Sequence, residues 1–234
     1  MPPANPTVEP ELDALVGTDL ATYTARFPVF GGWDLQHRNR AYLDAVPESV
    51  TAFGSLRLDA TLVACTGCHY LLEPAQDRDL YARLSAEAGV PIVSATLAIT
   101  HVLRAIRSDE VVLVSPYEPW LTELSERYWS RAGFTVSRVV QIAAAHPYEV
   151  EPAALTAEVE SAALDPDATI LFTGTGAPTV DTMLALRATR SSAIVSSNLC
   201  GAWWAHAVLD GGRQGREAHP LVADLDRRIA AAAG

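Results

Sequence analysis

The stretches DATLVACTG (residues 59–67) and DATILFTGTG (residues 167–176) decide the fold that we expect for this chain. Each reads as an apolar strand that runs into a small polar turn, and the two copies lie roughly a hundred residues apart. Internal similarity of this kind indicates two related halves. The copies differ at the turn, because the first contains Cys65 where the second has Thr173 and Gly174.

The sequence around both stretches alternates between strand and helix patterns. In the second half, EVVLV (110–114) is followed by helical spacing and a glycine stop, and the same order then recurs. Strands that alternate with helical segments indicate parallel βαβ units. We therefore predict an α/β fold of two pseudo-symmetric Rossmann-like or flavodoxin-like parallel-sheet halves, with the active-site cleft between them. The expected halves cover residues 1–108 and 109–210, and a C-terminal helix covers 211–234.

One strand of the repeat is missing from the first half. NPTVEPELDAL (5–15) resembles SPYEPWLTEL (115–124), but only residues 1–4 precede the first copy, where the second copy has a strand. ATYTARFPVF (21–30) reads as the next strand of the first half. The pattern indicates a truncated or misassigned start, since losing a central strand would expose unpaired backbone. The alternative is a first sheet with one strand fewer.

The composition limits the class of partner. The chain has 234 residues, 49% of them hydrophobic, and a formal net charge of −11. So acidic a surface repels phosphate backbones and argues against nucleic acid. No apolar run approaches the roughly 18 residues of a membrane span, and the N-terminal stretch lacks a signal-peptide pattern. We expect a cytoplasmic protein that binds a small molecule and has no membrane partner.

The three cysteines, Cys65, Cys68 and Cys200, do not indicate a disulfide framework. Cys65 and Cys68 form a C-x-x-C pattern with His69 beside it. A zinc site needs a second such pair or well-spaced histidines, and a thioredoxin-like pair needs the context of a reducing enzyme. We therefore predict no metal at this motif.

The polar turns follow the expected strands at their carboxyl ends, where open α/β sheets bind ligands. Two facing halves would bring Cys65 and the turn at Thr173 and Gly174 to opposite walls of one cleft. Glycine-rich turns and helix N-termini present N–H groups to an anion and lower the pKa of a nearby thiol. This combination predicts a carboxylate substrate, with Cys65 as base or nucleophile. The alternative is that Cys65 is a small buried residue that ends a core strand.

Four runs resemble the maleate cis-trans isomerases and arylmalonate decarboxylases of the aspartate/glutamate racemase superfamily. They are PPANPTVEPEL, VACTG, SPYEPWLTEL and VSSNLCGAWWAHAVLDG. The resemblance implies chemistry without a cofactor, in which Cys65 is the nucleophile that adds to a double bond. Asn5 would hold a carboxylate, and Tyr117 would donate its hydroxyl to a carboxylate oxygen. The substrate-binding residues expected together are Asn5, Thr66, Gly67, Tyr117, Thr173, Gly174, Thr175 and Asn198.

The second turn departs from the family pattern, which has a cysteine where this chain has Gly174. Racemisation needs an acid and a base on opposite faces of the substrate, so a two-cysteine racemase is not available here. Cys200 would serve as a second thiol only if it faces the cleft.

Three functions are compatible with these residues. The first is a cofactor-independent isomerase of a small unsaturated dicarboxylate. The alternative is a decarboxylase of substituted malonates with Cys65 as proton donor, and the second alternative is a carboxylate-binding protein without turnover. The family likeness and the tryptophan pair at 203–204 also predict a homo-oligomer.

Overall fold

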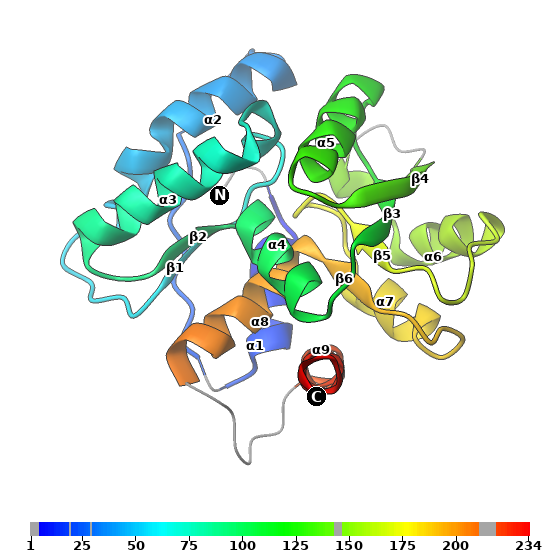
Figure 1. The fold of residues 1–234 in the computed structure, drawn as a ribbon. Helices are drawn as coiled ribbons and strands as arrows, with labels where there is room; N and C mark the ends of the chain where they lie inside the picture. Colours follow the sequence, from blue (N-terminus) through cyan, green and yellow to red (C-terminus); the bar gives the residue numbers. More distant parts are fainter. Residues whose placement is uncertain (1–4, 19, 29, 143–146, 211–218) are drawn as a thin grey trace.

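The computed structural model describes residues 5–18, 20–28, 30–142, 147–210 and 219–234, which form an α/β fold with two parallel sheets (Figure 1). The first sheet pairs β1 (Thr61–Val63) with β2 (Ile92–Ser94). The second sheet has the order β4-β3-β5-β6. Its strands are β3 (Glu110–Ser115), β4 (Thr135–Gln141), β5 (Ile170–Phe172) and β6 (Ile194–Ser196).

Helices connect and cover the strands. In Figure 1, α2 and α3 lie on one side of the first sheet, and α1 and α8 lie on the other. None of the helices in the described part of the chain is long and apolar enough to cross a bilayer. The helices are α1 (Val8–Val16), α2 (Leu35–Ser49), α3 (Pro74–Ala88), α4 (Ala95–Ala105), α5 (Pro119–Arg131), α6 (Pro152–Ser161), α7 (Val180–Leu186), α8 (Ser197–Asp210) and α9 (Pro220–Ala233), with 3-10 helices η1 (His69–Leu71) and η2 (Pro147–Glu149).

The two copies of the repeated stretch form β1 and β5, and each strand leads directly into a polar turn. β5 is buried along its whole length, and β3 is buried from Val111 to Ser115. Strands covered on both faces read as continuous apolar runs, which is why these segments could be recognised. The expected α/β fold with two pseudo-symmetric halves is confirmed.

The halves interlock through α4 and α8, which follow the last strand of each sheet and pack against each other. α8 also packs against α1 and β1 of the first half. α8 lies especially close to β1 at Gly201, because a Cβ at this position would lie 2.5 Å from Cδ2 of Leu62. Helix α9 provides the expected C-terminal helix, while residues 211–218 of that expected span lie outside the described residues.

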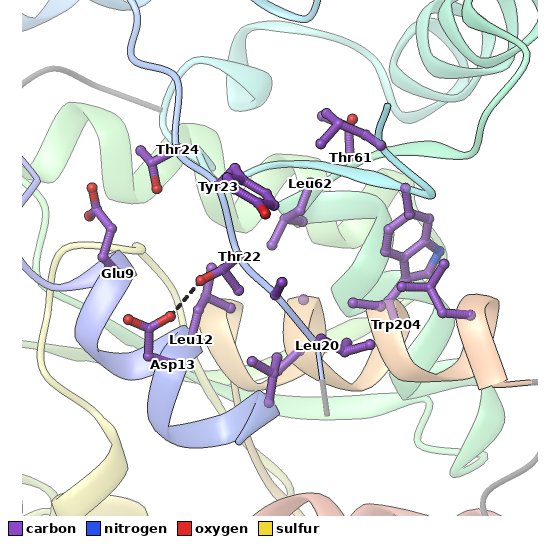
Figure 2. Close-up of a pocket in the computed structure, with 18 of the residues that line it drawn as sticks. Glu9, Leu12, Asp13, Leu20, Thr22, Tyr23, Thr24, Thr61, Leu62 and Trp204 are labelled. Atoms are coloured by element: carbon purple, nitrogen blue, oxygen red, sulfur yellow. Dashed lines mark hydrogen bonds between the residues drawn. The ribbon is translucent and has the colours of Figure 1, made fainter. Parts of the chain in front are cut away.

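The strand expected at residues 21–30 is wrong, because the described part of this segment has no regular secondary structure and pairs with no strand. In the second half, β3 lies between β4 and β5. In the first half, a cavity of about 150 Å³ lies between residues 20–24 and β1, lined also by Leu12 and Trp204 (Figure 2). No described strand lies between residues 20–24 and β1, so residues 20–24 have no neighbouring strand with which to form β-sheet hydrogen bonds. The expectation about the chain start falls on residues 1–4, outside the described residues.

Candidate active site

The turn after β1 buries two thiols side by side. Cys65 lies two residues past the end of β1, and Cys68 lies three residues further on, directly before η1. Their relative exposures are 5% and 0%. The Cys68 thiol donates a hydrogen bond to Sγ of Cys65 over 3.0 Å. The C-x-x-C spacing therefore places a proton donor against the candidate nucleophile.

The two thiols have opposite acidities. The hydrogen bond from Cys68 lowers the pKa of Cys65 well below its usual value, and this effect outweighs the opposing effect of burial. Burial and the adjacent Cys65 raise the pKa of Cys68 well above its usual value. Cys65 is therefore the thiolate of the pair, and Cys68 keeps its proton.

His69 supports the thiol pair from the next position in the chain. Its Nδ1 lies 2.7 Å from the Cys65 carbonyl oxygen and 3.3 Å from Sγ of Cys68, and its Nε2 lies 2.6 Å from the Tyr81 hydroxyl. Burial lowers the pKa of His69, but the interaction with Cys65 and the charge of Asp77 outweigh it, and the net shift is upward. The protonated, positively charged form of His69 is thereby favoured beside the Cys65 thiolate.

The same three side chains have the composition of a metal site. The thiol sulfurs and an imidazole nitrogen lie within 4.8 Å of one another. Both ring nitrogens of His69 are already hydrogen-bonded within the protein, so this set fits a hydrogen-bonded nucleophile better than a metal centre. Sequence analysis noted His69 only as a neighbour of the motif and missed its contacts, although the CTGCHY run contained the signal.

Two hydroxyl groups lie beside Cys65. The Oγ1 atom of Thr66 lies 2.6 Å from the hydroxyl of Tyr117. Burial raises the pKa of Tyr117 well above its usual value, so its phenol stays protonated and can donate a hydrogen bond. Paired hydroxyl donors next to a nucleophile can stabilise negative charge that develops on a carboxylate.

The second turn, which follows β5 in the other half, also lies next to Tyr117. Gly174 has φ +90°, a conformation that favours glycine. A Cβ at this position would lie 3.2 Å from Cγ of Pro116 and 3.2 Å from the Tyr117 hydroxyl oxygen. The absence of a side chain at Gly174 thus lets the second turn pack directly onto Tyr117.

Hydrogen bonds join the two turns across the halves. Asn5 donates from Nδ2 to Oγ1 of Thr175 over 3.0 Å, and Thr175 donates to the Ala64 carbonyl over 3.0 Å. The Thr173 hydroxyl bonds to the hydroxyl of Tyr70. The structure therefore brings the predicted residues of both halves into one connected group.

Asn198 lies on α8 at the edge of this group. Its Nδ2 donates to Oε2 of Glu11 over 2.7 Å and to the Thr175 carbonyl over 3.1 Å. Both amide hydrogens are thus used within the protein. Glu11 is itself buried, and it also accepts from the backbone N–H groups of Thr179 and Val180. Its position in the first turn of α1 gave no signal of these contacts.

Cys200 has a different environment from Cys65. It lies on α8, is fully buried in the hydrophobic core, and burial alone raises its pKa. Such a thiol stays protonated and inert. Among the described cysteines, Cys68 is the one that the structure shows beside Cys65.

Comparison with known proteins places this geometry in a family. The family model described as arylmalonate decarboxylase matches residues 1–219. No curated protein matches the chain.

Solved structures show the same fold at low identity. The maleate isomerase Iso from Pseudomonas putida S16 is 19% identical with a TM-score of 0.81, covering 89% of this chain and 90% of that chain. A Nocardia farcinica maleate cis-trans isomerase mutant with a covalently bound succinylcysteine intermediate is 22% identical with a TM-score of 0.78, covering 89% and 90%. An unliganded arylmalonate decarboxylase is 18% identical with a TM-score of 0.77, covering 95% and 96%. Since the family model spans nearly the whole sequence and the fold agrees, the chain belongs to the arylmalonate decarboxylase family.

Proposed function

We propose that this protein is a cofactor-independent cis-trans isomerase of a small unsaturated dicarboxylate of the maleate type. The observation that carries the proposal is the hydrogen bond that Cys68 donates to Sγ of Cys65, which lowers the pKa of Cys65. An isomerase of this kind needs a nucleophile that is already ionised. The succinylcysteine intermediate bound covalently to the Nocardia farcinica enzyme fits the same chemistry.

The reaction needs one bond to form and then break. The Cys65 thiolate adds to one carbon of the double bond, and the displaced electron pair moves into the carboxylate attached to the other carbon. The hydroxyls of Thr66 and Tyr117 donate to the charged oxygens of this enediolate. The former double bond is now single and can rotate. When the electron pair returns, it expels the thiolate and leaves the trans isomer, with no net gain or loss of protons.

The proposed reaction has a direct test. The protein is incubated with maleate, and fumarate is followed by proton NMR while the intact mass reports any adduct on Cys65. We expect fumarate from the wild type and none from Cys65→Ala, because the nucleophile is gone. Cys200→Ala is the matched control, since it also removes a buried thiol but should retain activity. Absence of both fumarate and an adduct in the wild type would refute the proposal.

Decarboxylation of a substituted malonate is the second candidate, and the family match favours it. Loss of carbon dioxide would leave an enediolate at Thr66 and Tyr117, and the S–H of Cys65 would then protonate it. This route needs a protonated Cys65 at rest, whereas the pKa of Cys65 is lowered. Release of carbon dioxide from a panel of malonates, with no isomerisation of maleate, would favour this candidate over the first. If neither reaction occurs while carboxylates bind, the third alternative, binding without turnover, applies.

A further inference from the structure

Arg38 hydrogen-bonds to Tyr42 through its guanidinium group, but one of its buried donors, Nε, has no acceptor among the described residues. Arg38 lies on α2, one residue past the first turn capped by Asp34. Desolvating a donor without pairing it costs stability, so such a group indicates an acceptor that arrives with a ligand.

The next residue presents a second donor of the same kind. Asn39 is only 3% exposed, and its Nδ2 also has no partner among the described residues. This Nδ2 lies 3.4 Å from the position that a Cβ on Gly67 would take. The amide therefore lies in contact with the turn that carries Cys65 and Thr66.

Arg38 and Cys65 both influence the pKa values of Tyr42 and Tyr148. Burial is the main cause that raises the pKa values of Tyr42 and Tyr148, the Cys65 thiolate raises both further, and the Arg38 cation lowers both. The Tyr148 ring packs over Gly176 of the second turn. Arg38 and Cys65 thus both lie close enough to Tyr42 and Tyr148 to interact with them electrostatically.

The donors expected from sequence are largely occupied. The Nδ2 atoms of Asn5 and Asn198 donate to Thr175 and Glu11. A dicarboxylate whose first carboxylate lies at Thr66 and Tyr117 needs donors for its second one. Among the described residues, Nε of Arg38 and Nδ2 of Asn39 on α2 are two buried donors without a partner, and Asn39 lies against the Cys65 turn.

We propose that Arg38 and Asn39 bind one carboxylate of the substrate and make the site selective for dicarboxylates over monocarboxylates. A guanidinium group suits this role because its planar fork matches a carboxylate and its charge strengthens each hydrogen bond. The inference rests on the proposed function for the reaction, but the recognition of two carboxylates can be measured without turnover.

The test uses two unreactive probes of equal chain length, succinate with two carboxylates and butyrate with one. We expect the wild type to bind succinate roughly ten- to a hundred-fold more tightly than butyrate in isothermal titration calorimetry. Arg38→Met should remove most of this preference and leave butyrate binding unchanged. Arg40→Met is the matched control, because Arg40 is exposed on the same helix and its loss should change neither value.

Turnover separates this inference from the proposed function. With maleate, Arg38→Met should raise KM by a similar factor and change kcat less. If the wild type does not isomerise maleate but still shows Arg38-dependent binding of succinate, the proposed function fails and this inference holds. Equal succinate binding by wild type and Arg38→Met, or no preference for succinate in the wild type, would overturn it. Should Arg38→Met fold poorly, Arg38→Lys keeps the charge without the fork and should retain part of the preference.

Discussion

The reactivity of Cys65 depends on a neighbour three residues away. Burial alone would keep this thiol protonated, as it does at Cys200. The S–H of Cys68 reverses the balance because it stabilises the thiolate directly. The acid–base behaviour of the site is therefore set by a local hydrogen bond within one turn.

Cys68→Ala should raise the pKa of Cys65. A hydrogen bond to a charged group contributes about 1.5–3 kcal/mol, which corresponds to roughly one to two pH units. The thiolate is lost as pH falls through its pKa, so the acidic limb of the kcat/KM profile should move to higher pH in this variant. Cys68→Ser keeps a donor and should restore part of the profile. Superimposable profiles for wild type and Cys68→Ala would contradict the assignment.

Replacing Gly174 should cost more stability than replacing a glycine of similar conformation in open space. Gly174→Ala combines positive φ with contacts to Pro116 and Tyr117. Gly89 has φ +70° and nothing within 4 Å of an added Cβ, so Gly89→Ala isolates the conformational cost of about 1 kcal/mol. We expect about 2–3 kcal/mol for Gly174→Ala, measured by urea unfolding. Equal losses in the two variants would argue against the contact.

At the scale of elements, one carboxylate joins three helices. Glu11 on α1 accepts from the backbone at the start of α7 and from Asn198 on α8. Burial raises the pKa of Glu11, although these donors oppose the shift. Because Asn198 also holds the second turn, this contact connects the packing of helices to the geometry of the candidate site.

Glu11→Ala should destabilise the fold, because it leaves several buried donors without an acceptor. We expect the free energy of unfolding to fall by about 2–4 kcal/mol, measured by chemical denaturation. Glu9→Ala is the control on the same helix, since Glu9 forms a partly exposed ion pair with Arg26 and its loss should cost less than about 1 kcal/mol. A loss at Glu11 no larger than that at Glu9 would show that the buried contacts contribute little.

At the scale of the whole molecule, helices of the two halves pack against each other. α8 follows the last strand of the second sheet yet packs on β1, α1 and α4 of the first half. The bonds from Asn5 to Thr175 and from Thr175 to Ala64 cross the same boundary. Without the second half, β1 would lose its contact with α8, and α1 and α4 would lose theirs.

The halves should therefore unfold together. We expect one thermal transition in scanning calorimetry, with equal calorimetric and van't Hoff enthalpies. Tryptophan fluorescence, which reports on the second half through Trp129 and on its contact with the first half through Trp204, should give the same midpoint as circular dichroism. Two resolved transitions would mean that the halves are independent domains.

Sequence reasoning succeeded where local pattern carries the information. The two DAT stretches predicted β1, β5 and their turns, because buried strands read as apolar runs and turn residues follow them. It failed at residues 21–30, because a strand needs a partner that the local sequence does not reveal. The pairing of His69 with Tyr81 and the orphan donors on α2 depend on distant elements, so they could be seen only in three dimensions.

The conformation of Gly174 also has an evolutionary consequence. Some glycine codons become cysteine codons by one base change, so a single mutation can place a thiol in the second turn. The backbone at this position is left-handed in φ, and the Tyr117 hydroxyl fills the space that a side chain would need. A mutant lineage would have to change the turn and move a tyrosine before the new thiol became useful. A site with thiols only in the first turn is therefore a state that point mutation does not easily change.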